Sequence, residues 1–252
     1  MKVINFLIIL MIFPLAIYAS SERDSVLLRA EQYYQQSEYS KVISEYRSLI
    51  DDGWASAALF YNLGNAYFKI NDIKSAILYY ERAKRLAPND EAINQNLEFT
   101  RSLIFDRVEA LPEHFIVKWG KAIRDLTTVR AWAWWSVASF VVTLVLCFLF
   151  LFLRNVSVRR FAVGFGIFCF ALSLTTFTLG YLQKSNIERT DEAIVFAPSV
   201  TIKSSPTDSG NNLFIIHEGL KVRIEDRIGE WVEIRIPDGN KGWMRITDLE
   251  VI

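Results

Sequence analysis

The chain has 252 residues, and its 28 lysines and arginines are balanced by 28 aspartates and glutamates. A formal net charge of zero, without blocks of like charge, gives nucleic acid no electrostatic reason to bind, so we expect no nucleic-acid partner. Apolar residues make up 52% of the chain but lie in separate runs, so each segment must be interpreted by itself.

Residues 1–19 have the layout of a signal peptide. Lys2 is followed by an apolar run that ends at Ala16, and the small residue Ala19 precedes Ser20. The run is shorter than the roughly 20 apolar residues that a transmembrane helix needs. We therefore expect export of the chain from Ser20 onward, and an uncleaved anchor is the alternative.

Residues 24–110 show helical periodicity and contain an internal repeat. Tyr33 aligns with Tyr67, and Tyr46 aligns with Tyr80, at a spacing of about 34 residues, which is the tetratricopeptide period. The second copy spans residues 57–90 and carries the residues typical of that repeat: Phe60, Leu63, Gly64, Tyr67, Ala76, Tyr80, Ala83 and Pro88. It resembles the tetratricopeptide repeat family, which implies a helical hairpin of an α-solenoid.

The first copy of the repeat is less regular. Arg29 stands where Leu63 stands in the second copy, and Trp54 replaces Pro88, so we expect the first copy to be a capping unit. A further helix from about Asp90 to Ile104 is expected to cover the other end, because a single repeat cannot bury its own apolar face.

The first helix of the second copy carries polar residues. In tetratricopeptide proteins this helix usually lines the concave binding face. Asn62, Asn65 and Lys69 are therefore our candidate peptide contacts. The alternative is a solvated helix face without a ligand.

Residues 113–130 predict an amphipathic helix next to a membrane. Trp119 and Ile123 recur at helical spacing, with Lys118 and Lys121 between them. A helix in the membrane interface and an ordinary amphipathic helix packed on the repeats fit this pattern equally well.

Residues 131–153 and 161–182 are apolar, uncharged and each long enough to span a bilayer. The connecting residues 154–160 contain three arginines, a composition typical of cytoplasmic loops. Basic residues before the first span favour the reverse orientation, but the signal peptide independently exports the preceding segment. We therefore expect a two-helix membrane hairpin with both flanking domains outside.

Residues 191–252 change to a period of two, with turn residues between short runs, which predicts a small all-β domain. Its most typical motifs are Gly229-Glu230-Trp231-Val232 and Asp238-Gly239-x2-Gly242-Trp243-Met244. They resemble the bacterial SH3 (SH3b) family, which implies a small SH3-like β-barrel. We expect Trp231 in the core of the barrel, and Trp243, next to Gly242, at the edge of a groove for peptides.

No set of residues for catalysis, a metal ion or a cofactor is recognisable in the sequence. The two imidazoles, His114 and His217, lie in different segments and outside any ligand or nucleophile motif. Cys147 and Cys169 lie in apolar runs, where a free cysteine packs as a small apolar residue. We therefore expect a protein that is not an enzyme and has no cofactor.

The order of these segments resembles the BatE-type proteins of the Bacteroides aerotolerance (Bat) family. The shared order is an export signal, tetratricopeptide hairpins, an amphipathic stretch, a two-helix membrane hairpin and a terminal SH3b domain. The resemblance implies membrane proteins with von Willebrand A domains and an associated MoxR-type ATPase as partners. It implies no catalytic residues.

The expected fold is therefore multidomain: an α-solenoid, two transmembrane helices and a small β-barrel. The expected location is the bacterial inner membrane, with both soluble domains on the periplasmic or external side. The expected function is a scaffold that docks envelope proteins through the repeats. The alternative is a sensor or anchor that binds peptidoglycan through the SH3b domain.

Overall fold

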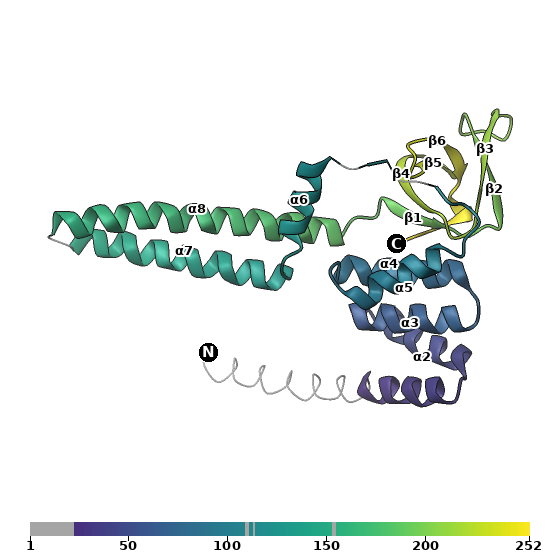
Figure 1. Ribbon diagram of the computed structural model, residues 1–252, viewed down its shortest axis with the longest axis horizontal. Helices are drawn as coiled ribbons and strands as arrows, with labels where there is room; N and C mark the ends of the chain where they lie inside the picture. Colours follow the sequence, from purple (N-terminus) through teal and green to yellow (C-terminus); the bar gives the residue numbers. More distant parts are fainter. Residues whose placement is uncertain (1–22, 109–110, 113, 153–154) are drawn as a thin grey trace, which may run out of the picture. The chain divides into compact units, whose positions relative to one another are not determined.

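The computed structural model describes residues 23–108, 111–112, 114–152 and 155–252. The signal peptide predicted for residues 1–19 lies outside this part of the chain. The chain forms two compact units (Figure 1). Of these described residues, those up to Leu111 and from Thr190 onward make the first unit, which we call the helix–sheet unit. Those from Pro112 to Arg189 make the second, the hairpin unit.

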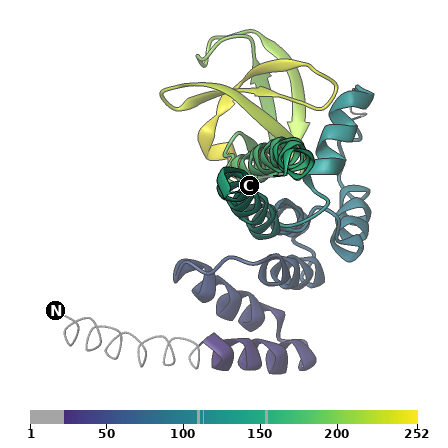
Figure 2. The same ribbon diagram turned by 90° about the vertical axis from the view of Figure 1, so that its left-hand side faces the viewer.

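The helix–sheet unit begins with a stack of helices. They are residues 23–35, α2 (Tyr39–Asp51), α3 (Ala57–Lys69), α4 (Ile73–Leu86) and α5 (Glu91–Arg101). From α2 to α5, each helix packs on the next one in the chain, and Figure 2 shows the resulting layers. This is the arrangement that the repeat period predicts.

Polar side chains fix the starts of three of these helices. Ser56, Asp72 and Asp90 each accept a hydrogen bond from the backbone N–H three residues later, so they cap α3, α4 and α5. Asn71 has a φ of 62°, a left-handed conformation that asparagine tolerates, and it forms the turn between α3 and α4. These caps and this turn make α3 and α4 one hairpin.

The two helices of this hairpin approach closely at Gly64. A Cβ atom at this position would lie 2.7 Å from two ring carbons of Tyr80, so no larger residue fits without displacing the ring. Tyr80 is itself buried. All the other residues that define the repeat except Pro88 are buried with it or pack against the core: Leu63, Tyr67, Ala76, Ala83 and Phe60.

The hairpin unit consists of α6 (Phe115–Arg124), α7 (Val129–Phe152) and α8 (Val156–Ile187). Helices α7 and α8 pack along each other, and both are long and apolar enough to cross a membrane. Their suitability as membrane spans follows from length and composition, the same properties from which the sequence predicted two spans.

Helix α8 begins earlier than we expected. The side chain of Asn155 accepts a hydrogen bond of 2.9 Å from the backbone N–H of Ser157 and thereby caps the helix. Arg159 and Arg160, which we expected in a loop, therefore lie in the first turns of α8.

A seam of small and hydroxyl-bearing residues joins α7 to α8. The Ser136 hydroxyl donates to the carbonyl oxygen of Ser173 over 3.1 Å, and the Ser173 hydroxyl donates back to the carbonyl oxygen of Ser136 over 2.9 Å. Small residues let apolar helices approach closely enough for such bonds to form. Cys169 is buried on α8, whereas Cys147 is exposed on α7, and both are free thiols.

The C-terminal part of the helix–sheet unit is one antiparallel sheet with the strand order β3-β2-β6-β5-β4-β1-β7. Its strands are β1 (Glu192–Val195), β2 (Ser199–Lys203), β3 (Asn212–His217), β4 (Lys221–Ile228), β5 (Trp231–Arg235), β6 (Lys241–Arg245) and β7 (Leu249–Val251). The sheet is not closed into a barrel, because β3 and β7 remain at its two edges. Next to β7, helix α4 packs against β1.

Strands β2, β5 and β6 bury alternate residues, as the period of two predicts, whereas β1 buries three residues in succession. Val232 and Ile234 of β5 and Met244 of β6 are in the core. Trp231, which we expected in the same core, lies half-buried on the opposite face. The physical reason is the alternation itself, since Trp231 precedes the inward-facing Val232 on the same strand.

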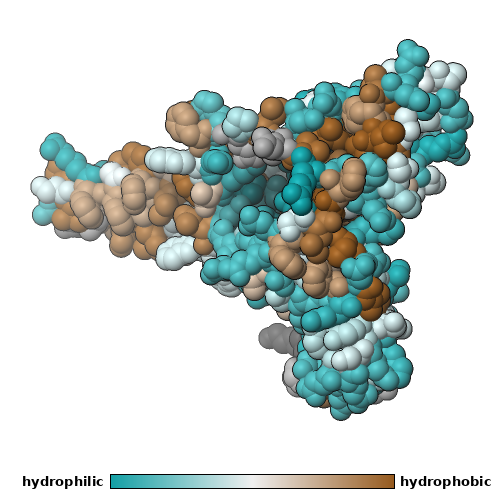
Figure 3. Space-filling model, turned by 45° about the vertical axis from the view of Figure 1, so that its right-hand side comes forward, coloured by the Kyte–Doolittle hydropathy of each residue, from teal (hydrophilic) through white to brown (hydrophobic). Residues whose placement is uncertain are grey.

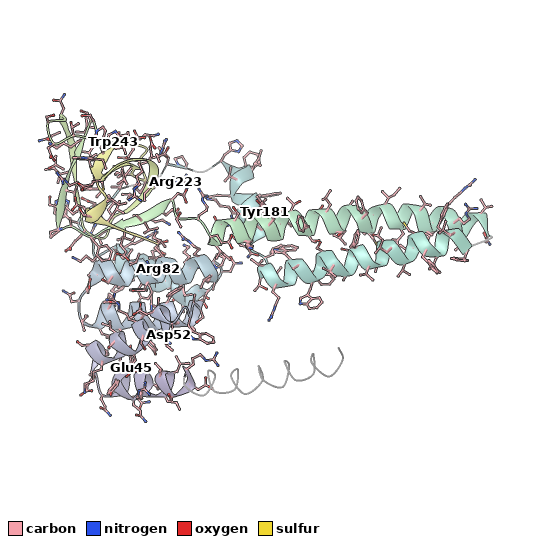
Figure 4. The ribbon with its side chains drawn as sticks, turned by 180° about the vertical axis from the view of Figure 1, so that it is seen from behind. Glu45, Asp52, Arg82, Tyr181, Arg223 and Trp243 are labelled. Carbon is pink, nitrogen blue, oxygen red and sulfur yellow. The ribbon has the colours of Figure 1, made fainter. Side chains whose placement is uncertain are left out.

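Helix α4 and the sheet share a buried apolar contact. Ile194 of β1 belongs to the same buried cluster as Ile77 of α4. Beside it, the Arg82 guanidinium donates a hydrogen bond of 2.7 Å to the backbone oxygen of Val251, and Figure 4 shows Arg82 on the sheet side of the helices. The outer side of the hairpin is therefore covered by the chain's own sheet.

Glu81 is the charged centre of this contact. Its side chain is only 4% exposed, and it pairs with Lys221 of β4 at 3.0 Å and with Arg101 at the end of α5. Burial by itself raises the pKa of Glu81, but the positive charges of Lys221 and Arg101 outweigh burial and hold the pKa below its ordinary value. One carboxylate thus joins α4, α5 and the sheet.

Candidate functional site

A cavity of about 350 Å³ opens among the helices of the repeats, and we call it the repeat groove. Its walls come mainly from α3 and α5, with one residue each from residues 23–35 and from α4. The residues that line it are Tyr34, Tyr61, Asn65, Phe68, Lys69, Tyr80, Asn96, Phe99 and Thr100.

A hydrogen-bond network holds the inner wall of the groove. The Tyr80 phenol donates to the side-chain oxygen of Asn65 over 2.7 Å. The Asn96 amide donates to the same oxygen over 3.1 Å and to the Tyr61 hydroxyl over 2.9 Å. These bonds tie α3, α4 and α5 together, so the wall is formed before any ligand binds.

Tyr80 acts as a permanent donor in this network. Burial raises the pKa of its phenol well above the ordinary value, and the neighbouring Tyr61 raises the pKa further. The phenol therefore stays protonated at any physiological pH.

The mouth of the groove combines aromatic rings with a positive charge. The ring centroids of Phe68 and Phe99 are 5.9 Å apart, and Phe99 is 58% exposed. The exposed Lys69 lies one residue beyond Phe68. Aromatic faces with a few fixed amide and hydroxyl groups suit an apolar side chain and its peptide backbone.

Two of the three predicted peptide contacts line the groove. Asn65 and Lys69 are part of its wall, although Asn65 uses its oxygen to hold Tyr80 and Asn96. Asn62 does not line the cavity. It is exposed on α3.

The contribution of α5 to the groove was not predicted from the sequence, because we expected this helix only to cover the end of the repeats. Asn96, Phe99 and Thr100 supply that wall. A signal for it was present, because these residues recur at the helical spacing of three and four. Phe99, an aromatic residue between two polar ones on that side, marks the mouth.

The residues assigned to the SH3b-like site lie on β5 and β6. Trp231 and Trp243 are both half-buried on the outer face, and the Arg245 guanidinium lies 5.4 Å from the ring centre of Trp231. Gly242 is buried against β2. A Cβ atom there would clash with a methyl carbon of Ile202, so the glycine permits the close contact of β6 with β2.

Each of the two histidines contacts a neighbouring side chain. The Nδ1 atom of His217 lies 2.9 Å from a carboxylate oxygen of Asp106, and the ring of His114 lies 4.7 Å from that of Phe115. Among the residues that the structure describes, no cluster of three or more histidine, cysteine or acidic side chains is placed to hold a metal ion.

Stacked helical hairpins around a preformed groove define a protein-interaction module. In agreement, residues 57–90 match the tetratricopeptide repeat family, which confirms the predicted repeat. This repeat is a non-catalytic interaction unit, and no enzyme family is indicated. No curated protein sequence matches the chain.

Proposed function

We propose that the protein is a membrane-attached scaffold that holds a segment of a partner protein in the repeat groove. The observation that carries this proposal is the groove itself, a preformed cavity of about 350 Å³ with an exposed aromatic mouth. The ligand class that fits it is a peptide segment with at least one apolar side chain.

The other side of the repeats supports the same assignment. Ile77, Glu81 and Arg82 of α4 already contact the sheet. The sheet therefore covers the α4 side of the α3–α4 hairpin. A partner protein can reach this hairpin from the side of the repeat groove.

Attachment to a membrane is supported by the surface of α7 and α8. Only 11% of the most apolar stretch of α7 and 28% of that of α8 is buried within the protein. Figure 3 shows apolar side chains along this part of the surface. So large an apolar surface is unfavourable in water and favourable in hydrocarbon.

Two spans also agree with the construction of the helix–sheet unit. Its helices precede α7 and its strands follow α8, yet Glu81 and Lys221 meet in one buried ion pair. Both segments must therefore lie on the same side of the membrane, which an even number of crossings provides. The export signal predicted from the sequence supports our proposal that this side lies outside the inner membrane.

For the partners, the resemblance to BatE-type proteins supplies the finer proposal. We propose that the groove docks a Bat-type envelope protein, such as a membrane protein with a von Willebrand A domain, in a complex with a MoxR-type ATPase.

The test is site-specific photo-crosslinking of the full chain in cells. A photoreactive phenylalanine at Phe99, in the mouth of the groove, is expected to capture a partner. The same group at Leu28, which is 66% exposed but does not line the groove, is the matched control and is expected to capture none.

The double substitution Phe99→Ser with Lys69→Ala is expected to reduce co-purification of the partner at least tenfold, a typical loss for a central contact. Equal crosslinking at the two positions, or co-purification that is unchanged in the double variant, would reject the groove as the docking site. Recovery of a partner without a von Willebrand A domain would reject only the Bat-type assignment.

A second candidate function is binding of peptidoglycan by the sheet. The observation that favours it is the outward position of Trp231 and Trp243. We expect the full chain in detergent to co-sediment with purified peptidoglycan, and Trp231→Ala with Trp243→Ala to abolish this. The variant Trp54→Ala, which changes an exposed tryptophan of the repeats, is the control. Failure of the unmodified chain to co-sediment rejects this function.

A further inference from the structure

We propose that α6 binds along the headgroup layer of an anionic bilayer. No residue of α6 is buried by the described part of the protein. Its two largest apolar side chains are also among its most exposed, with Phe115 at 65% and Trp119 at 72%. An amphipathic helix that leaves such residues uncovered requires a second apolar phase or a partner.

The charge of α6 indicates that a lipid bilayer, and not a protein partner, covers its apolar side. Phe115, Trp119 and Ile123 follow one another at intervals of four and share one side of the helix. Lys118 and Lys121 lie on the other side together with Val117; α6 has no acidic residue within its bounds, and Asp125, which follows it, pairs with Arg124 at 2.7 Å. A helix with an apolar side and lysines on the opposite side complements anionic lipid headgroups above an apolar layer.

Hydrogen bonds fix α6 to one end of the α7–α8 hairpin. The Trp132 indole of α7 donates to the carbonyl oxygen of Arg124 over 2.9 Å. The Gln183 amide of α8 donates to the carbonyl oxygen of Thr127 over 2.8 Å. The short connection between α6 and α7 is thus held by both long helices. Figure 1 shows α6 running across the axis of α8, the direction of the bilayer surface if α8 spans it.

Aromatic residues mark the same end of the hairpin. Trp134 and Trp135 near the start of α7 and Tyr181 near the end of α8 are all exposed, and Figure 4 shows Tyr181 close to α6. Exposed tryptophan and tyrosine gather at the headgroup level of membrane proteins. The position of α6 therefore coincides with the level at which headgroups are expected.

The proposed binding of α6 rests on the proposal that α7 and α8 span the membrane, so the experiment tests the two proposals separately. The full chain is reconstituted into vesicles of phosphatidylcholine, with or without phosphatidylglycerol. Cys147→Ser and Cys169→Ala remove the native thiols, and an environment-sensitive fluorophore is attached at Phe115→Cys. The matched control carries it at Val117→Cys, which lies away from the apolar side of α6 and is 50% exposed.

The fluorophore at position 115 is expected to be quenched by lipids spin-labelled near the headgroup and protected from iodide in water. At position 117 we expect the reverse. Equal quenching by iodide at both positions would show α6 in water and overturn the proposal. Protection of position 115 from both quenchers would show that protein covers it, which also overturns the proposal.

A second pair of variants tests the preference of α6 for anionic lipids. Lys118→Gln with Lys121→Gln is expected to lower the ratio of lipid-contacting to water-contacting fluorophore about fivefold per lysine in phosphatidylglycerol vesicles only. Lys184→Gln, an exposed lysine of α8, is the control and is expected to leave the ratio unchanged. An unchanged ratio in the double variant would overturn the anionic assignment. Alkaline extraction of the same vesicles tests the spans: release of the chain rejects them, whatever α6 does.

Discussion

Replacement of Glu81 by alanine is expected to lower the free energy of unfolding of the helix–sheet unit by about 1–3 kcal/mol. Glu81 is buried between Lys221 and Arg101, and Lys84 is a third positive charge near it. Without the carboxylate these cations repel one another, although Lys221 keeps its ion pair with Glu192 at 2.8 Å and the Arg101 side chain is 41% exposed. The loss exceeds that of an exposed pair because the carboxylate itself is buried and both of its partners lose it.

Thermal and urea unfolding of the full chain in detergent measure this effect. Glu218→Ala is the matched control, because Glu218 pairs with Lys74 of α4 at 2.7 Å, but its side chain is 49% exposed. Exposed pairs contribute below about 1 kcal/mol, so the control should unfold almost like the unmodified chain. Equal stability of the two variants would show that Glu81 does not join helices and sheet.

The same carboxylate predicts a dependence on pH. The pKa of Glu81 is lower in the folded protein than the ordinary value of 4.5, so folded protein binds the proton less tightly than unfolded chain does. Its stabilisation is complete above the ordinary value and is lost as the pH falls through the folded pKa. We expect the variant Glu81→Gln to lose less stability than the unmodified chain between neutral and acid pH. An identical pH profile for the two proteins would contradict this role of Glu81.

Gly64→Ala is expected to destabilise the helix–sheet unit by about 1–3 kcal/mol, the usual cost of an overpacked core. The added Cβ would meet the Tyr80 ring at 2.7 Å, and Tyr80 cannot retreat easily because its phenol holds Asn65. The substitution therefore also disturbs the wall of the repeat groove, and we expect weaker capture of the partner at Phe99.

Gly120→Ala provides the control for Gly64→Ala. Gly120 also lies in a helix, but nothing stands within 4 Å of a Cβ atom there. Alanine is the better helix former, so this change should leave stability unchanged or slightly improved. The free energies of unfolding of the two variants are compared by thermal and denaturant unfolding. A Gly64→Ala protein as stable as the control would refute the close contact.

The repeat could be predicted from the sequence because its physical requirements are local and periodic. Gly64 and Tyr80 lie in adjacent helices at the spacing that the tetratricopeptide pattern fixes, and the structure places them in contact. The apolar hairpin could be predicted for the same reason, since length and composition suffice. The β character of the C-terminal segment followed from its period of two.

The covered side of α4 could not be predicted, because it depends on pairing across the chain. Glu81 reads as a solvated residue of an amphipathic helix, and its partner Lys221 is 140 residues away. No local pattern shows that the two meet. In the groove, the α3 residues Asn65 and Lys69 could be predicted from the repeat pattern. The α5 residues Asn96 and Phe99 could not, because the pattern assigns this helix only the role of covering the end of the stack.

The two halves of the helix–sheet unit are also separated in time. Residues 112–189 lie between them, so the ribosome makes α4 long before β4 exists. At roughly 5–20 residues per second, α4 waits on the order of ten seconds for the sheet. During this interval Ile77 and Glu81 have no sheet to cover them. A new chain therefore offers this side of α4 to chaperones, and completion of the unit reports that both long helices have been made.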